Sequence, residues 1–513
     1  MKNSRIGKVY LVGAGPGAVD LITMRGAEVL SRAQSVIYDH LVNPGLLRLA
    51  PTSAELIYAG KRGGEHRDLG QREINALLIE RAIKGINVVR LKGGDPFIFG
   101  RGGEEAEALV AAGIEFEVVP GITSAISVPA FAGIPLTHRE YGSFVAFVTG
   151  HEEASEASAP WDDLAHAAKR GGTIVILMAT ARLTGILKRL ADAGLPRETP
   201  AAAIQSGTLA NQKTISATLA TLADDAERAK LAAPTIVVVG ECASLREHLK
   251  WAERMPLFGR RIVVTRASAT ASSFARELRA LGAEAIEFPT IETTAPDSYA
   301  TLDAQISRID FFDWIIFTSA NGVESFIERL RSLRKDIRAL GKARIAAIGP
   351  ATAHSIESYA LTVDAMPLEY RAEAIIDAIG IEKIRGAQIL IPRAQVAREV
   401  LPEMLRKCGA TEVIAAPAYK TIKPAGAAID RMCDSLESTG YDLVAFTSSS
   451  TASNFVEMVG KPKPGVKAAA IGPITAATAT QHGFEVVVKP REYTVAALVI
   501  AIREYFASQS QPG

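Results

Sequence analysis

Short apolar runs rich in valine and isoleucine alternate with amphipathic runs along the whole chain. Runs of this kind are typical of buried strands in α/β proteins, where helices cover both faces of a mostly parallel sheet. The pattern therefore predicts α/β architecture throughout. The expected strands lie at 8–15, 35–40, 87–95, 116–121, 142–151, 173–178, 235–241, 260–267, 313–319, 343–350, 387–394, 442–450 and 468–473.

An internal repeat marks the second half of the chain. The stretch "DWIIFTSANGVESFIERL" followed by "ARIAAIGPATA" recurs as "DLVAFTSSSTASNFVEMV" followed by "AAAIGPITAA", and the segment from Arg261 resembles that from Gln388. A repeat of this size predicts two similar α/β lobes. Clefts between lobes are favoured ligand sites, and parallel sheets present ligands beyond the carboxyl ends of their strands.

The length of 513 residues is too large for one core and predicts about three or four domains. We place the main boundary near Met255-Pro256, where Gly-rich motifs give way to the repeat. A net charge of +1 gives no general reason to expect nucleic acid or a membrane as partner. The N-terminus lacks the apolar core of a signal peptide, and no apolar run approaches the roughly 20 residues of a membrane span.

The cysteines indicate reduced thiols in a cytoplasmic protein. Cys242, Cys408 and Cys433 lie far apart, without a Cys-x-x-Cys pair or a histidine at zinc-ligand spacing. We therefore expect no metal site.

The stretch "VYLVGAGPGAVDL" raises the question of cofactor. Residues Gly13–Ala18 satisfy the G-x-G-x-x-G/A fingerprint of a dinucleotide fold, and Asp39 follows about 20 residues later. Pro16 removes one backbone N–H from a turn that normally offers N–H groups to a pyrophosphate. A nicotinamide-dependent dehydrogenase, an ordinary strand-to-helix turn and a site for another cofactor all stay open on this stretch alone.

Longer motifs follow in a specific order: "VVRLKGGDPFIFGRGGEEAEAL", "VVPGITSA", "AGIPLTHR" and "FVTGHE". Together with the first turn they resemble the uroporphyrinogen-III C-methyltransferases of the tetrapyrrole methylase family over nearly the whole first half. The resemblance implies a pair of α/β domains, usually in a homodimer, with S-adenosylmethionine between them. It implies transfer of two methyl groups from this cofactor to uroporphyrinogen III, giving precorrin-2.

The resemblance also assigns residues. It makes Asp39 the proton acceptor and Lys61 the proton donor. The substrate carries eight carboxylates, so nearby cations acquire a binding role, although each can equally be a solvated surface group. The expected cofactor residues are Pro16, Gly93, Gly94, Asp95, Ile98, Thr123, Ser124, Met178 and Gly207, and the expected substrate residues are Arg62, Arg101, His138 and Arg139, with His66 and Arg67 nearby.

The second half resembles uroporphyrinogen-III synthase in the order of "VTRA", "IIFTSANGV", "AAIGPATA", "PRA", "AYKT", "FTSSST" and "AAIGPITAAT". This family cyclises hydroxymethylbilane with loss of water and without a cofactor. Its chain starts in one lobe, builds the other and returns. The resemblance makes Tyr419 the acid that assists departure of the hydroxyl group, and the expected carboxylate-binding residues are Thr318, Ser319, Ser448, Ser449 and Thr475, with Arg266, Arg393, Lys420 and Lys489 as charges.

The preferred interpretation is a bifunctional enzyme in which residues 256–513 make uroporphyrinogen III and residues 1–255 methylate it, towards sirohaem or cobalamin. The methyltransferase divides near 120–140, lobe one of the synthase spans about 258–290 plus 421–513, and lobe two spans about 291–420. Two rivals stay open: the dehydrogenase, and a C-terminal half that only binds a tetrapyrrole.

Overall fold

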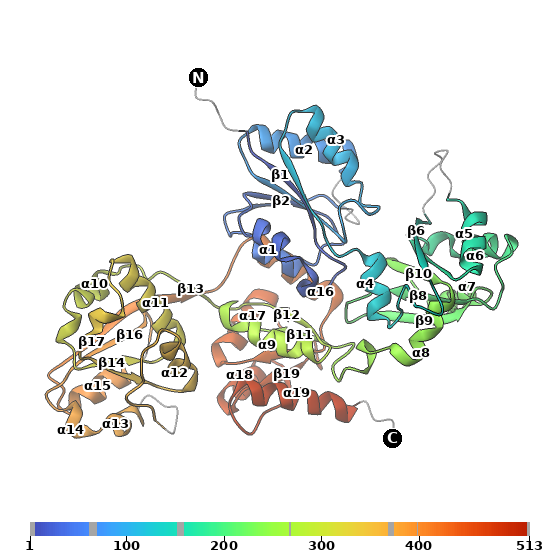
Figure 1. The fold of residues 1–513 in the computed structure, drawn as a ribbon. Helices are drawn as coiled ribbons and strands as arrows, with labels where there is room; N and C mark the ends of the chain where they lie inside the picture. The colour runs from blue at the N-terminus through green and yellow to red at the C-terminus, as the bar shows by residue number, and fades with distance from the viewer. Residues whose placement is uncertain are drawn as a thin grey trace. The chain divides into compact units, whose positions relative to one another are not determined.

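The computed structural model describes residues 6–60, 69–150, 159–265, 268–367, 374–397 and 399–509. It divides into two compact units, one formed by Met1–Pro289 together with Ala425–Gly513 and the other by Thr290–Pro424. Four five-stranded sheets, each flanked by helices, make up these units (Figure 1). The α/β class predicted from the apolar runs is confirmed.

The first sheet is parallel throughout, in the order β3-β2-β4-β1-β5. Successive strand residues point to opposite faces and enter two separate core clusters, Val9 and Leu11 on one face and Val12 on the other. Both faces are buried, so these strands read as continuous apolar runs. The elements are β1 (Val9–Gly13), α1 (Met24–Leu30), β2 (Ser35–Tyr38), β3 (Glu55–Tyr58), α2 (Gln71–Ile83), β4 (Val88–Lys92), α3 (Gly102–Ala111) and β5 (Phe116–Val119).

The second sheet departs from the expected parallel arrangement. Its order is β6-β7-β10-β8-β9, and only the β6–β7 pair is parallel. Residues 206–212 alone join β8 to β9, and a connection this short can link only antiparallel neighbours. The elements are α4 (Ser124–Phe131), β6 (Phe144–Thr149), α5 (Trp161–Lys169), β7 (Gly172–Leu177), α6 (Leu183–Asp192), β8 (Pro200–Gln205), β9 (Lys213–Thr218), α7 (Leu222–Arg228), β10 (Thr235–Val239) and α8 (Arg246–Leu249).

The third sheet combines two distant parts of the chain. It is parallel in the order β12-β11-β18-β19-β20, and Ile262 of β11 pairs with Leu443 of β18. Phe446, Phe455 and Phe484 pack edge to face beneath it. The elements are β11 (Arg261–Val264), α9 (Ser268–Ala280), β12 (Glu284–Glu287), α16 (Ala427–Thr439), β18 (Leu443–Phe446), α17 (Ser449–Val459), β19 (Lys467–Ala470), α18 (Pro473–Gln481), β20 (Glu485–Val488) and α19 (Val495–Gln509).

The unit Thr290–Pro424 contains the fourth sheet, in the order β13-β17-β16-β14-β15, with only the β13–β17 pair antiparallel. Its run β14-α11-β15-α12 has the same order as β18-α17-β19-α18, which is the repeat seen in the sequence. The elements are β13 (Glu292–Thr294), α10 (Ala300–Ser307), β14 (Trp314–Phe317), α11 (Ala320–Ser332), β15 (Arg344–Ala347), α12 (Pro350–Glu357), α13 (Ala374–Ile379), α14 (Ile381–Ile384), β16 (Gln388–Ala394), α15 (Val400–Lys407) and β17 (Glu412–Ile422).

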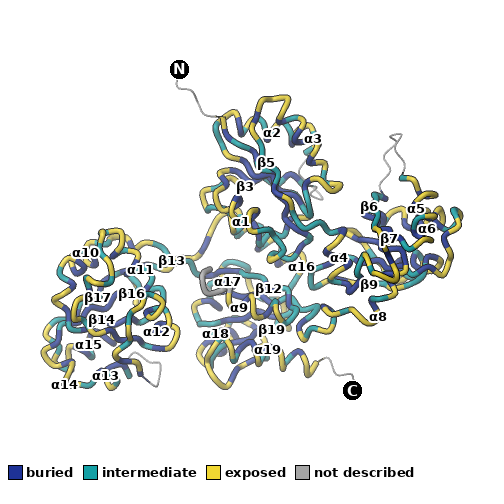
Figure 2. Tube along the Cα trace, viewed as in Figure 1, coloured by how far each residue is buried: buried dark blue, intermediate teal, exposed yellow. Residues whose placement is uncertain are grey.

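The most deeply buried residues lie on the strands. Central strands such as β4, β10 and β14 are buried along their whole length, whereas the outer sides of the helices are exposed (Figure 2). Across the described part of the chain, none of the helices combines the length and the apolar character that crossing a lipid bilayer requires.

Three loops meet at the carboxyl edge of the first sheet through glycines. A Cβ atom on Gly121 would lie 2.2 Å from the Gly94 oxygen and 2.6 Å from Gly13 Cα, and one on Gly13 would lie 2.4 Å from Gly121 Cα. Gly15 and Gly94 exchange backbone hydrogen bonds of 3.2 and 2.7 Å. These loops follow β1, β4 and β5, and their backbones are in direct contact.

This contact predicts a large difference between two glycine-to-alanine changes. Gly121→Ala places a methyl group against the Gly94 and Gly13 backbones and forces the loops apart. It is expected to destabilise the first sheet by about 1–3 kcal/mol or more. Gly103→Ala is the matched control, because a Cβ there meets nothing within 4 Å and the site is helical. Calorimetry of both variants checks this; equal melting of Gly121→Ala and wild type contradicts the described contact.

Candidate active site

A cavity of about 740 Å³, the main cavity, belongs to the first unit. Its wall combines the glycine loops of the first sheet, the start of α4, the loop after β8, and residues of β11, β12 and α16. Of the residues predicted from the sequence, the cavity brings together Pro16, Asp39, Gly93, Gly94, Asp95, Ile98, Thr123, Ser124 and Gly207.

Asp95 ties two of the glycine loops together. Its Oδ1 accepts the Phe97 N–H at 2.8 Å, and its Oδ2 accepts the Gly121 N–H at 3.0 Å. Each carboxylate oxygen retains a further lone pair, so the group can still face a cationic ligand. Asp95 thus shapes the cavity as well as supplying negative charge to it.

Loops of the second sheet close the other side of the cavity. The Thr208 hydroxyl accepts the Ala18 N–H at 3.1 Å, which joins the loop after β8 to the first glycine loop. Asn43 donates to the Gly17 oxygen at 2.8 Å. A Cβ on Gly207 would lie 2.4 Å from a methyl group of Val128, so this position admits no side chain. The cavity therefore lies where the loop after β1 and the loop after β8 are hydrogen-bonded to each other.

Four predicted residues are not in the cavity wall. Met178 follows β7 with a φ of 56° and is half exposed. Arg101 forms an ion pair with Glu104 at 2.8 Å, the His138 ring contacts Tyr141, and Arg139 is exposed. Their roles stay predictions. Lys61, Arg62, His66 and Arg67 lie outside the described residues.

A buried charge cluster lies behind Asp39. The Asp39 Oδ2 is 3.5 Å from Arg90 Nη2, and its Oδ1 accepts the Leu41 N–H at 3.1 Å. Glu105 Oε1 accepts from Arg90 Nε at 3.2 Å and from Lys92 Nζ at 2.8 Å. Glu105 is fully buried, and Arg90 and Lys92 are each 4% exposed. Arg90 thereby holds Asp39 from behind the cavity wall.

The cluster holds two cations against one fully buried carboxylate. Burial lowers the pKa of Lys92, the charge of Arg90 lowers it further, and Glu105 opposes both effects. Glu105 Oε2 has no hydrogen-bond partner in the described part of the chain. Our sequence interpretation missed this cluster, although Arg90 and Lys92 interrupt an apolar strand and such charges normally need a buried partner.

Tyr419 lies within the unit Thr290–Pro424, on β17. Its side chain is 8% exposed, and its hydroxyl is 3.0 Å from the Ser319 Oγ, which also accepts the Gly322 N–H at the start of α11. Burial raises the pKa of the Tyr419 phenol, and the Ser319 hydrogen bond opposes this in part. The phenol therefore keeps its proton at neutral pH and is chemically able to act as an acid. Thr318 directly follows β14 and precedes Ser319.

Other residues predicted for the second half already have partners or structural roles. Ser448 caps α17 by accepting the Thr451 N–H at 3.4 Å, Ser449 begins that helix, and Thr475 is 6% exposed in α18. Lys420 pairs with Asp297 at 2.6 Å, and Arg393 pairs with Glu399. Arg266 lies outside the described residues, and Lys489 directly follows β20.

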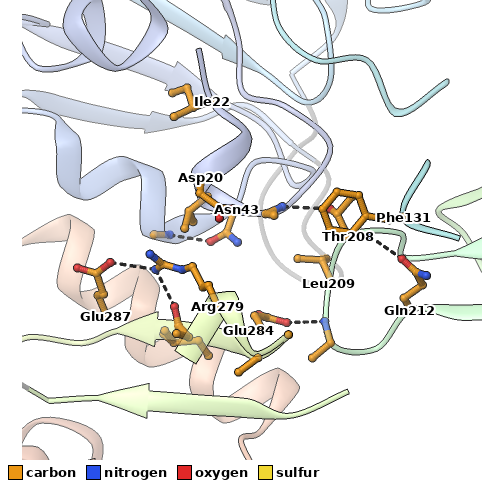
Figure 3. A pocket seen from close by; sticks show the side chains of 18 of the residues that line it. Asp20, Ile22, Asn43, Phe131, Thr208, Leu209, Gln212, Arg279, Glu284 and Glu287 are labelled. Carbon is orange, nitrogen blue, oxygen red and sulfur yellow. Dashed lines mark hydrogen bonds and ion pairs between the residues drawn. The ribbon is translucent and has the colours of Figure 1, made fainter. Parts of the chain in front are cut away.

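A second cavity, of about 540 Å³, lies in the first unit next to the main one (Figure 3). Two polar contacts in its wall join residues before Met255 to β12: Glu284 accepts the Ala210 N–H at 3.0 Å, and Arg48 donates to the Glu287 carbonyl oxygen. These two contacts fix β12 against the first two sheets. Arg279 of α9 in turn pairs with the Glu287 side chain at 2.9 Å.

Comparison with known proteins gives two family matches. Residues 8–223 match the family of tetrapyrrole (corrin/porphyrin) methylases, and residues 272–500 match uroporphyrinogen-III synthase HemD. The porphyrin biosynthesis protein HemD of Ruminiclostridium josui is 37% identical over 486 residues, which cover 94% of this chain and 95% of that protein. The chain belongs to these two families, joined in one polypeptide.

Each half also has separate relatives. The S-adenosyl-L-methionine-dependent uroporphyrinogen III methyltransferase of Methanosarcina barkeri is 51% identical over 245 residues, covering 47% of this chain and 94% of that protein. A solved structure of uroporphyrin-III C-methyl transferase from Thermus thermophilus, complexed with S-adenyl homocysteine, is 35% identical and covers 47% of this chain and all of that one, with a TM-score of 0.40. Because the chain belongs to the methylase family, the glycine turn at Gly13–Ala18 is not interpreted as the cofactor site of a nicotinamide-dependent dehydrogenase.

The buried cluster of this methylase domain yields a stability prediction. Glu105→Gln removes the buried negative charge from Arg90 and Lys92 and is expected to destabilise the domain by about 3–5 kcal/mol at pH 7. Glu107→Gln, on the exposed side of the same helix, is the control with little expected effect. Urea unfolding of the full chain measures both.

The same variant has a predicted pH dependence. Loss of Glu105 lowers the pKa of Lys92 further below its unfolded value of 10.5. Between the two pKa values the unfolded state binds more protons than the folded state, so stability rises with pH. The loss of stability in Glu105→Gln relative to wild type should therefore shrink as the pH rises towards 10.5, the value for unfolded Lys92. A loss that stays constant or grows would contradict the lowered pKa of Lys92.

Proposed function

We propose that this chain catalyses two consecutive steps of tetrapyrrole biosynthesis. Its C-terminal half is a uroporphyrinogen-III synthase that cyclises hydroxymethylbilane with loss of water. Its N-terminal half is an S-adenosylmethionine-dependent uroporphyrinogen-III C-methyltransferase that gives precorrin-2. The main support for this function is that the chain matches both families. In addition, one relative aligns with 94% of this chain.

The main cavity supports S-adenosylmethionine as the cofactor of the first half. Its glycine loops expose backbone to a ligand, Ile98 and Val128 offer apolar contact, and Asp95 supplies a carboxylate for a sulfonium or ammonium group. In the reaction a pyrrole carbon forms a bond to the methyl group as the sulfur–carbon bond breaks, and one proton leaves the macrocycle. We assign Asp39, in the wall of this cavity, as the acceptor of that proton.

The surroundings of Tyr419 support its role as the acid of the second half. Cyclisation breaks a carbon–oxygen bond, and the departing hydroxyl needs a proton to leave as water. We assign Tyr419 as that donor, because its hydroxyl is buried and lies 3.0 Å from the Ser319 Oγ, beside the start of α11. The end of α11 nearest to it adds N–H groups that favour negative charge, such as a substrate carboxylate.

Three further features belong to the proposal. The chain divides into a methyltransferase at 1–255 and a synthase at 256–513, with the lobes predicted above.

The chain forms a homodimer through the methyltransferase half. The best support is that Phe144 and Phe147 are partly exposed on β6, which is an edge strand. The chain is cytoplasmic, as its three free cysteines favour.

A coupled assay with the full chain tests both halves. Hydroxymethylbilane and S-adenosylmethionine should give precorrin-2 and S-adenosylhomocysteine. Unmethylated type III isomer would overturn the methyltransferase assignment, whereas type I uroporphyrinogen, the product of spontaneous closure, would overturn the synthase assignment and favour a half that only binds a tetrapyrrole.

Asp95→Ala is expected to lower the affinity for S-adenosylmethionine at least about ten-fold, because two N–H groups lose their acceptor and a negative charge is lost. Asp95→Asn keeps one acceptor and should be intermediate. The exposed Asp20→Ala is the matched control. Calorimetric titration at low temperature measures all three; wild-type affinity in Asp95→Ala would place the cofactor elsewhere.

Tyr419→Phe is expected to slow cyclisation by about 10²-fold or more, the usual contribution of a general acid. Tyr441→Phe is a close control, because burial likewise raises the pKa of the Tyr441 phenol and no role is assigned to it. The initial rate of type III isomer formation from hydroxymethylbilane measures both. If the two variants behave alike, Tyr419 is not the acid.

A further inference from the structure

Helix α16 has two faces of different character. Met432 and Leu436 are buried in the core of the third sheet. Both side chains also border the main cavity, and residues three and four positions apart form a polar stripe beside them that lines the same cavity: Arg431, Asp434, Ser435, Ser438 and Thr439. A helix from the synthase half therefore supplies part of the wall of the methyltransferase cavity.

Arg431 is available to a ligand. Its guanidinium lies 5.0 Å from the centre of the Tyr58 ring and 3.6 Å from an exposed Asp434 oxygen, and it makes no hydrogen bond with the described residues. Arg261, the other arginine described in this wall, is already bonded to Glu284 and to the Gly440 oxygen. The Ser435 hydroxyl likewise has no hydrogen bond within the described part of the chain, and lies one turn from Arg431.

These groups fit a carboxylate. A guanidinium over an aromatic ring is held in place while its N–H groups still point outward, and a hydroxyl one turn away adds a further donor. We propose that Arg431 and Ser435 form a carboxylate subsite for uroporphyrinogen III in the methyltransferase cavity. This inference rests on the proposed function, which supplies a substrate with a carboxylate on every side chain of the macrocycle.

The position of α16 is fixed by contacts independent of any ligand. Ala428 packs against the core cluster of Leu46 and Leu47 in the first domain. The contacts of Glu284 and Glu287 across the second cavity hold the sheet on which α16 packs (Figure 3). The subsite is thus a built part of the cavity, and the methyltransferase half alone would lack it.

The test measures methylation of supplied uroporphyrinogen III by the full chain, which bypasses the synthase step. Arg431→Met keeps an apolar stem against Tyr58 and removes the charge. It should raise KM for uroporphyrinogen III about ten-fold, leave the affinity for S-adenosylmethionine unchanged and weaken the salt dependence of KM. Arg431→Lys should recover part of the loss, because it restores the charge without the fork.

Arg503→Met is the control, since Arg503 is an exposed arginine on α19 outside the cavity wall. Its KM should stay within about two-fold of wild type. If Arg431→Met also stays within two-fold, or if Arg431→Lys is no better than Arg431→Met, the subsite is overturned while the proposed function stands. If the wild-type chain does not methylate uroporphyrinogen III, the proposed function itself fails.

Discussion

The contact between Gly13, Gly94 and Gly121 is the constraint on which the first active site depends. No side chain fits at Gly13 or at Gly121, because the two backbones touch each other and the Gly94 oxygen, and this contact holds the loops after β1, β4 and β5 together. The contact sets where Asp95 stands, and Asp95 in turn hydrogen-bonds the third loop. A cofactor that enters here meets backbone groups already in place, so little ordering is needed when it binds.

The charges beneath that edge follow from the same geometry. Arg90 and Lys92 alternate along β4, and both reach Glu105 on α3, because neither can reach water from a strand buried on both faces. The Asp39 carboxylate in the cavity wall therefore lies beside a buried cation, Arg90, whose charge solvent screens little. In such a place a change of charge at the reacting macrocycle is felt more strongly than it would be in water.

Most of what the sequence could predict came from short-range patterns of apolar residues and from the internal repeat. The apolar runs predicted the α/β class, and the repeat predicted two similar parallel lobes. Seven strands were not among those expected: β3, β8, β9, β12, β13, β17 and β20. Of these, β8 and β9 gave weak strand signals, because "PAAAIQ" is rich in alanine and "KTISAT" is largely polar. Pro16, Gly93 and Thr123 line one cavity because each follows a strand of the same sheet, whereas α16 reaches that cavity only through tertiary packing, which no local pattern reports.

The third sheet has a consequence for the order in which the chain matures. Its central pair, β11 and β18, joins segments separated by the whole of the unit Thr290–Pro424. On the ribosome, the first two sheets are complete long before β18 emerges, so they fold as units while the third sheet still waits for its partner strands. Helix α16 directly precedes β18 and arrives equally late. A nascent chain can therefore carry a folded methyltransferase domain whose cavity is still open on one side, and the wall is added only when synthesis of the second half is nearly finished.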